Sequence, residues 1–163
     1  MAATHDAHDR PMIWLGVFLF VIGLVTGTQE RHFKNMRMGL SAHLEGVMNG
    51  MFLMALGAIW GEVNLPPSVQ RTARWAMLYG TYGNWLFTSL GAVMGTAVAN
   101  PILSQGHSGK PWQERVVGLG FRSMRNSLFV GLPLVLWGLI RRRAEARESV
   151  RESEDAAEQQ KFR

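Results

Sequence analysis

The chain has 163 residues and no cysteine, which suits one domain and excludes disulfides, cysteine-held iron–sulfur clusters and a cysteine nucleophile. Its net charge is +5 at pH 7, and the basic run Arg141-Arg142-Arg143 directly follows an apolar segment. This pattern is typical of a cytoplasmic membrane flank, so we expect no nucleic-acid partner.

Apolar residues fall into four segments, which predict an all-α fold: a four-helix transmembrane bundle. The first segment covers residues 11–28, where Asp9 can cap a helix and Pro11 can begin it. A cleavable signal peptide is the alternative, but the residues before Pro11 carry charges of both signs and no small-residue cleavage site follows. We therefore expect a retained helix.

Three further spans are expected, each bounded by helix-breaking residues. They cover residues 41–63 before Pro66-Pro67, 73–99 before Pro101, and 116–140 with a kink at Pro133. Residues 1–140 then form a four-span membrane domain. Residues 141–163 form a charged cytoplasmic tail, either a solvated helix or a disordered segment.

The distribution of basic residues predicts the membrane topology. Four spans place both ends of the chain on one side of the membrane. Basic residues are more numerous at the amino terminus, in the second loop and in the tail than in the first and third loops, and the tail carries most of this difference. We therefore expect a multi-pass protein of the inner (cytoplasmic) membrane, in contact with lipid, with both termini cytoplasmic.

Glycines recur within the spans. Gly46-x-x-x-Gly50 and Gly91-x-x-x-Gly95 suit close helix contact, either within one subunit or between identical subunits. Small residues are also simply common in membrane helices, so the spacing leaves both interpretations open.

Three polar residues interrupt the second span: His43, Glu45 and Asn49. Glu45 and Asn49 share one helix face, whereas His43 lies about 120° from Asn49 around the axis. His43 is a potential metal or haem ligand, or an interfacial residue bonded to loop backbone. A cofactor held by His43 could meet Asn49 in two ways. The site could lie between subunits, with Asn49 supplied by the neighbouring chain, or the cofactor could be wide enough to touch both helix faces.

The third and fourth spans also carry polar side chains. Tyr79 and Tyr82 stand among threonine, serine and asparagine residues in helical spacing, which can bond neighbouring helices or line a cavity for an aromatic ligand. Arg122 and Arg125 lie one turn apart on the fourth span. They can extend to the membrane surface, or pair with anions such as haem propionates or the Glu45 carboxylate.

Several chemistries are disfavoured by the residues present. His43 is the one histidine in the predicted spans, so a single chain cannot offer two histidines to a buried haem. This argues against a bis-histidine electron-transfer cytochrome and favours an open coordination position. Neither a Ser-His-Asp arrangement nor a glycine-rich phosphate loop is indicated.

The segment Asn35–Phe52, NMRMGLSAHLEGVMNGMF, resembles the hydroxylaminobenzene mutases, and the likeness in size and layout covers residues 11–140. The resemblance implies conversion of hydroxylaminobenzene to 2-aminophenol, an intramolecular shift of the hydroxyl group from nitrogen to the ortho ring carbon. Such a reaction belongs to nitroarene degradation. The implied substrate is a small, neutral aromatic hydroxylamine.

Ala42-His43 followed by Asn49-Gly50-Met51 is similar, more distantly, to styrene oxide isomerase. That resemblance implies a homotrimer with haem b between subunits, iron held by His43 and acting as a Lewis acid, and Asn49 at the site. By approximate alignment, Tyr79 and Phe87 replace a carboxylate and a tyrosine on the third helix of that enzyme. A different substrate would require such a change.

These observations together predict a homotrimeric membrane isomerase. The predicted site comprises the iron ligand His43, the cofactor-binding Arg122 and Arg125, and the catalytic Asn49, Tyr79 and Tyr82. Asn49 would guide the departing hydroxyl, and the tyrosines would orient the ring or relay a proton. Glu45 would orient one of the arginines. The alternative is a non-enzymatic haem-binding or accessory membrane subunit.

Overall fold

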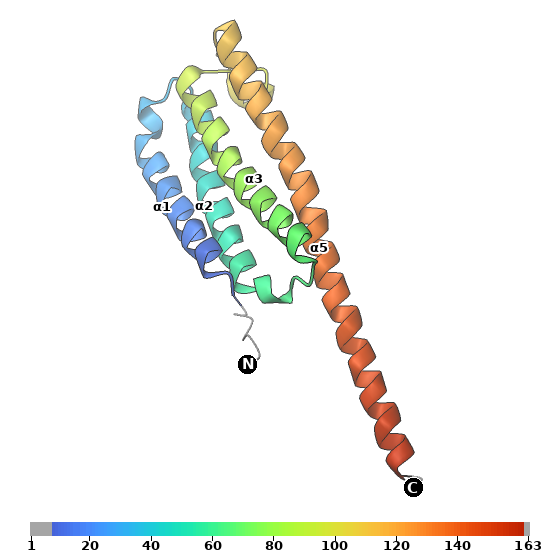
Figure 1. Ribbon diagram of the computed structural model, residues 1–163. Coiled ribbons are helices and arrows are strands. Elements are labelled where there is room, and N and C mark those ends of the chain that lie inside the picture. Colours follow the sequence, from blue (N-terminus) through green and yellow to red (C-terminus); the bar gives the residue numbers. More distant parts are fainter. Residues whose placement is uncertain (1–7, 162–163) are drawn as a thin grey trace.

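The computed structural model describes residues 8–161, and within them it contains helices and no strand. The predicted all-α class is confirmed. Residues 1–7 and 162–163, which belong to the predicted membrane domain and tail, lie outside the described residues. Four long helices run side by side (Figure 1): α1 (Arg10–Gln29), α2 (Met36–Ala58), α3 (Pro67–Met94) and α5 (Pro111–Lys161). Short helical turns separate them: η1 (Glu30–His32), η2 (Trp60–Glu62) and α4 (Pro101–Ser104).

The long helices pack in chain order. α1 packs against α2, α2 against α3, and α3 against α5, while α1 also touches α3. Across residues 8–161, α5 contacts neither α1 nor α2. The four helices therefore form an open row, in which α1 and α5 are the opposite flanks (Figure 1), and the expected four-helix bundle is not confirmed.

Local signals set the helix ends. Asp9 caps α1, accepting the backbone N–H of Met12 at 3.0 Å, as predicted. Asn35 caps α2 by accepting the N–H of Met38 at 3.0 Å, so this helix begins before the predicted residue 41. α3 ends at Met94, before the predicted residue 99, because Gly95 adopts a left-handed conformation with φ of 66°.

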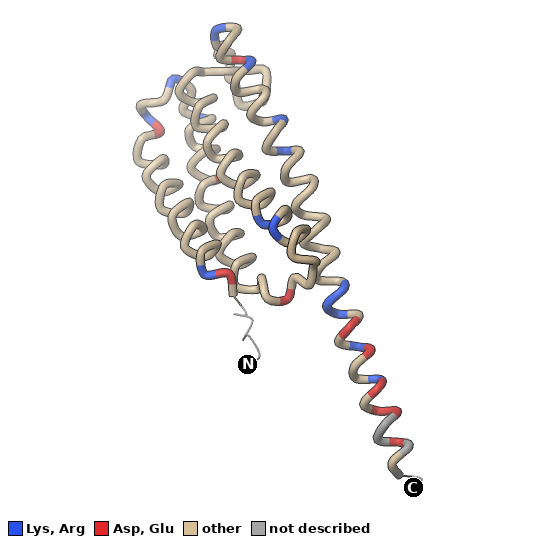
Figure 2. The backbone as a smooth tube through the Cα atoms, viewed as in Figure 1, with Lys and Arg blue, Asp and Glu red and all other residues tan. Residues whose placement is uncertain are grey.

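α5 is one continuous helix that passes through Pro133 and on to Lys161. Its last part projects beyond the other helices (Figure 1) and carries alternating basic and acidic residues (Figure 2). The sequence allowed either a solvated helix or a disordered segment for the tail. The tail is a helix as far as Lys161, and its residues 141–155 are exposed.

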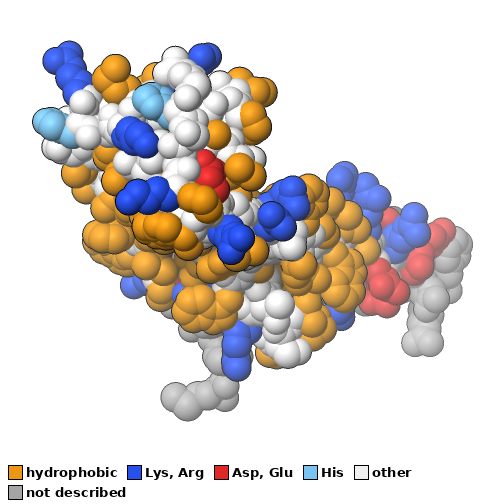
Figure 3. All heavy atoms as spheres, turned by 90° about the horizontal axis from the view of Figure 1, so that it is seen from above, with side chains coloured by type: hydrophobic (Ala, Val, Ile, Leu, Met, Phe, Trp, Pro, Cys, Tyr) orange, Lys and Arg blue, Asp and Glu red, His pale blue; other side chains and the backbone are white. Residues whose placement is uncertain are grey.

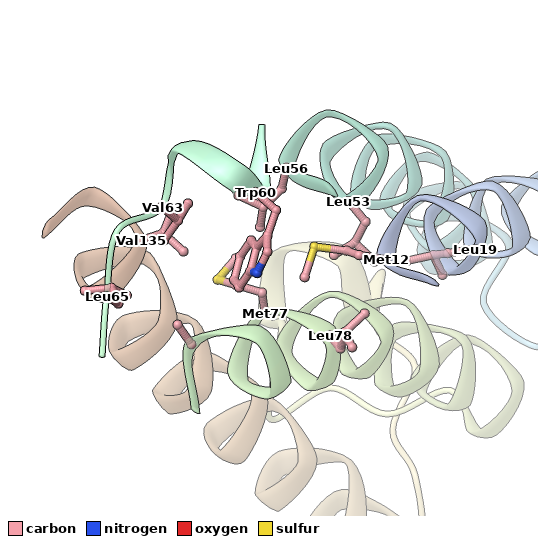
Figure 4. Close-up of a cluster of buried hydrophobic side chains, with 11 residues drawn as sticks. Met12, Leu19, Leu53, Leu56, Trp60, Val63, Leu65, Met77, Leu78 and Val135 are labelled. Atoms are coloured by element: carbon pink, nitrogen blue, oxygen red, sulfur yellow. The ribbon is translucent and has the colours of Figure 1, made fainter. Parts of the chain in front are cut away.

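The core lies between α1, α2 and α3 and reaches α5 at one end (Figure 4). Met12 and Leu19 of α1 meet Leu53 of α2 and Met77 of α3, and all four are fully buried. Trp60 of η2 closes the cluster toward α5. These contacts hold α1 and α3 at fixed positions on either side of α2.

Glycines let α1 and α2 approach to backbone contact. A Cβ atom on Gly23 would lie 2.6 Å from the backbone nitrogen of Val47, and one on Gly50 would lie 2.5 Å from that of Phe20. We call this contact the glycine seam; its members are Gly16, Gly23 and Gly27 of α1 and Gly46, Gly50 and Gly57 of α2. Gly46-x-x-x-Gly50 therefore packs within the chain.

Two helical segments, Arg10–His32 and Pro111–Asp155, are long and apolar enough to cross a membrane. Charged residues are sparse in the middle of the helical body and gather near its ends and on the tail (Figure 2). Hydrophobic side chains cover much of the surface of the body (Figure 3).

Candidate functional site

His43 faces α1 at one end of the glycine seam, beside Gly27. Its Nδ1 atom lies 2.8 Å from the backbone carbonyl oxygen of Gly23. Because a carbonyl oxygen can only accept, Nδ1 must carry the hydrogen, which leaves the lone pair of a neutral imidazole on Nε2. The bonded backbone belongs to a helix, and not to a loop as the interfacial interpretation assumed.

Gly27 provides the room for this imidazole. A Cβ atom there would lie 2.7 Å from Nδ1 and 2.9 Å from Cγ of His43. The half-buried ring is thus held by a hydrogen bond on one edge and by close packing on its side. Such an arrangement is the usual way in which a protein orients a metal-binding histidine.

Asn49 faces a different helix. Its Nδ2 atom donates to the carbonyl oxygen of Thr81 on α3, at 3.3 Å. His43 thus points toward α1 and Asn49 toward α3, in keeping with the predicted angular offset. Within one chain these two predicted site residues lie in separate helix interfaces.

Glu45 lies in the same α2–α3 interface as Asn49. Its carboxyl group faces Ser41, whose Oγ is 3.5 Å from Oε1, and Thr88 on α3. The buried Oε2 atom of Glu45 and the hydroxyl oxygen of Thr88 lack a well-formed hydrogen bond among the described residues. Glu45 makes no ion pair with Arg122 or Arg125 there, so the predicted orienting role toward these arginines is not seen within the chain.

The two predicted tyrosines diverge. Tyr82 donates its hydroxyl hydrogen to the carbonyl oxygen of Leu15 on α1, at 2.7 Å. Tyr79 points the other way, toward α5, where its hydroxyl lies 2.7 Å from Oγ of Ser123. Neither hydroxyl is brought to His43 or Asn49 within the chain.

Arg122 and Arg125 lie on the exposed side of α5. They line a small groove of about 320 Å³ with Val98, Ala99 and neighbouring residues of α5. Because α5 contacts neither α1 nor α2 in the described part of the chain, the arginines and His43 stand on different flanks. One subunit alone does not assemble the predicted cofactor site.

Two anchoring residues were missed by the sequence interpretation. Asn35 is fully buried and, besides capping α2, donates to the carbonyl oxygens of Leu103 at 2.7 Å and Ser104 at 3.2 Å. The carboxylate of Glu114 accepts backbone N–H groups from Ala97, Val98 and Gly109, at 2.8 to 3.1 Å. A polar residue before α2 (Asn35) and an acidic residue in the first turn of α5 (Glu114) are recognisable in the sequence, but their distant partners are not.

These hydrogen bonds shift the pKa of Glu114, which precedes the apolar part of α5. Partial burial acts to raise its pKa, but the three backbone donors, helped by the charge of Lys34, hold the pKa of this carboxyl below its ordinary value. Glu114 therefore stays ionised near neutral pH and fastens the loop between α3 and α5.

The donor set limits how a metal could be held. No group of three or more histidine, cysteine, aspartate or glutamate side chains lies close enough to bind a metal within residues 8–161. A metal held by three or more such side chains of one subunit is therefore not supported there. The Nε2 lone pair of His43 could bind the iron of a haem, because the macrocycle would supply most of the other iron ligands.

Fold and sequence together define the class of protein. Residues 8–140 match the model of the styrene oxide isomerase family, and the chain therefore belongs to that family. This makes it an isomerase, in agreement with the predicted class.

Two curated relatives come from Ectopseudomonas oleovorans. Hydroxylaminobenzene mutase HabB is 42% identical over 141 residues, which cover 86% of this chain and 85% of the relative. Hydroxylaminobenzene mutase HabA is 39% identical over 127 residues, covering 77% of this chain and 94% of the relative. The predicted resemblance is thus confirmed. No solved structure matches the chain.

Proposed function

We propose that this chain is a membrane-embedded isomerase that converts hydroxylaminobenzene to 2-aminophenol, with haem b held by His43. The identity to two mutases over most of their length supports the substrate. The observation that carries the cofactor is the contact between Nδ1 of His43 and the carbonyl oxygen of Gly23, because it leaves Nε2 as the ring nitrogen that can bind a metal.

The surface of the helical body supports a lipid environment. Large apolar side chains are exposed on the outer faces of the long helices, among them Trp14 at 73%, Met48 at 62% and Phe129 at 73%. A water-soluble monomer rarely exposes such an extensive apolar surface. We propose four spans with both ends of the chain cytoplasmic, because α1 begins at the same end of the body as the tail (Figure 1).

The separation of the predicted residues supports a shared site. His43 belongs to the α1–α2 flank, while Tyr79, Arg122 and Arg125 belong to the α3–α5 flank. A cyclic oligomer joins unlike surfaces of neighbouring subunits. We propose a homotrimer in which the α3–α5 flank of one subunit meets the α1–α2 flank of the next, so that the arginines bind haem propionates across the boundary.

The reaction needs no external oxidant or reductant. The N–O bond breaks, a C–O bond forms at the ortho carbon, and the proton lost from that carbon is balanced by one gained at nitrogen. Bound haem iron would supply Lewis acidity toward the hydroxylamine group. Asn49 keeps its Oδ1 atom and its second N–H for the migrating hydroxyl, because one N–H is engaged by Thr81.

The tyrosines are assigned different tasks. The hydroxyl hydrogen of Tyr82 is donated to the backbone carbonyl oxygen of Leu15, so Tyr82 positions α3 against α1 and in this way keeps the surroundings of the substrate ring in place. Tyr79 contacts the substrate from the neighbouring flank. An apolar site excludes water, which favours transfer of the hydroxyl to the ring over its loss to solvent.

The deciding experiment is conversion of hydroxylaminobenzene by the purified protein without reductant, with 2-aminophenol measured by chromatography. Wild type and the matched variant His107→Ala should form product and show a Soret band. His43→Ala should lose the Soret band, and its kcat/KM should fall at least about 100-fold. No product from wild type that retains a Soret band would indicate the non-enzymatic haem-binding alternative instead.

A further inference from the structure

An open groove of about 630 Å³ runs between α3 and α5, away from His43 and Asn49. Its walls are Arg71, Thr72, Trp75, Ala76 and Tyr79 of α3, and Ser123, Asn126, Ser127 and Val130 of α5. The space is ample for one substituted benzene ring. The groove is unusual for an apolar helical surface because it combines two aromatic rings with several hydrogen-bonding groups.

The aromatic wall is formed by Trp75 and Tyr79, one helical turn apart on α3. The two residues are 61% and 47% exposed. Aromatic rings exposed side by side offer a stacking surface to another aromatic ring.

The hydrogen bonds of Tyr79 determine what its oxygen can bind. Ser123 donates its single hydroxyl hydrogen to the carbonyl oxygen of Gly120, at 2.8 Å. The bond between Tyr79 and Ser123, at 2.7 Å, must therefore run from the tyrosine to the serine. The lone pairs of the Tyr79 oxygen remain available to accept a hydrogen bond from a donor in the groove.

Asn126 supplies the opposite wall with an amide group. It makes no hydrogen bond within the described part of the chain, in contrast to the neighbouring Ser127, which donates to the carbonyl oxygen of Ala76 at 2.9 Å. Asn126 is exposed, so in the lipid environment proposed above its unpaired amide would be costly, and a bound polar group would satisfy it.

We propose that this α3–α5 groove binds the substrate of the isomerase: Trp75 and Tyr79 stack against its ring, while the Tyr79 oxygen and the Asn126 amide bond its hydroxylamine group. Aromatic hydroxylamines fit because they join a flat ring to a small group that both donates and accepts hydrogen bonds. This inference rests on the proposed function, and it makes Trp75 and Asn126 specificity-determining residues.

The position of the groove agrees with a site shared between subunits. The groove lies on the α3–α5 flank, and His43 lies on the opposite α1–α2 flank. A ring of subunits joined through these flanks brings the flank that carries the groove in one subunit against the flank that carries His43 in the next.

The test uses the full-length protein in lipid nanodiscs and compares Trp75→Leu and Asn126→Leu with wild type. We expect each variant to raise KM for hydroxylaminobenzene about three- to tenfold, with kcat changed less than about twofold, since each removes one ground-state contact. Asn126→Gln, which keeps the amide, should recover part of the loss. The matched control Trp14→Leu removes an exposed tryptophan from α1, outside the groove, and should leave KM unchanged.

Binding of aniline, which cannot react, separates the two proposals. Loss of aniline binding in Trp75→Leu and Asn126→Leu supports the groove even if wild type fails to convert hydroxylaminobenzene. If wild type converts the substrate but both variants keep its KM and its affinity for aniline, the groove proposal is overturned while the proposed function stands. An equal rise in KM for Trp14→Leu would also overturn it, because the effect would then belong to exposed tryptophans in general.

Discussion

The imidazole of His43 and the main chain of Gly23 meet across the glycine seam, with 2.8 Å between Nδ1 and the carbonyl oxygen. This partner cannot rotate away as a side chain could, because the carbonyl is part of a helix. The orientation of the one histidine proposed to bind iron is therefore set by how α1 packs on α2. Substitutions in that seam should act on the cofactor without touching it.

Gly27→Ala tests this dependence. The added methyl group would lie 2.7 Å from Nδ1 of His43, so the ring must turn and lose its bond to Gly23. We expect haem content, measured by the Soret absorbance per chain, to fall about tenfold or more. In the control Ser149→Ala, which makes a small change on the exposed tail helix, haem content should stay at the wild-type level. Unchanged haem in Gly27→Ala would contradict the assigned orientation.

Asn35→Ala should destabilise the fold without altering the chemistry. The substitution removes the cap of α2 and leaves the carbonyl oxygens of Leu103 and Ser104 without their donor. We expect a loss of about 2–3 kcal/mol in the free energy of unfolding, measured with denaturant in detergent. Asn35→Asp keeps the acceptor for the Met38 N–H but cannot donate, so a loss equal to that of alanine would assign the stabilisation to the two donated bonds.

Glu114→Gln should remove a pH dependence of stability. Because the pKa of Glu114 in the folded protein lies below its ordinary value of 4.5, the unfolded chain binds the proton more tightly. The stabilisation is complete above pH 4.5 and is lost as the pH falls through the folded pKa. We expect the Tm of wild type to fall over this acid range more steeply than that of Glu114→Gln. Parallel curves would show that the carboxylate does not fasten the loop.

Asp9 and Arg74 tie the start of α1 to α3. The Asp9 carboxylate caps α1 and also accepts two bonds from the guanidinium group, one of them at 3.1 Å. Asp9→Asn keeps a competent cap but loses the charge, and should cost about 1–2 kcal/mol in unfolding free energy. Arg74→Gln should cost a similar amount. In a double-mutant cycle the two effects should be strongly non-additive; simple additivity would mean that the pair does not interact.

The sequence predicted the helical class, the cap of α1 and the angular separation of His43 from Asn49, because these follow from local periodicity. It misplaced the start of α2 and the end of α3, although Asn35 and Gly95 are recognisable cap residues. The length of an apolar segment differs from the length of its helix, because cap residues define the ends of a helix more sharply than hydropathy does.

Partners distant in the chain could not be predicted. Helical spacing places Ser41 beside Glu45, but it does not indicate that Glu45 also faces Thr88 and not the arginines of α5. The tyrosines show the same limit: Tyr79 and Tyr82 are near neighbours on α3, yet they bond to α5 and α1 respectively. Which helix lies on which side is a property of tertiary packing, which the helical period does not encode.

The glycine seam also bears on how such an enzyme can diverge. Gly23 and Gly46 each face the main chain of the other helix, so a larger residue at either position meets an obstacle that no side-chain change elsewhere can remove. The α3–α5 groove is walled by side chains, and these can be exchanged one at a time. With the groove as the proposed substrate site, mutation of its walls would give access to new substrates, while the support of His43 stays fixed.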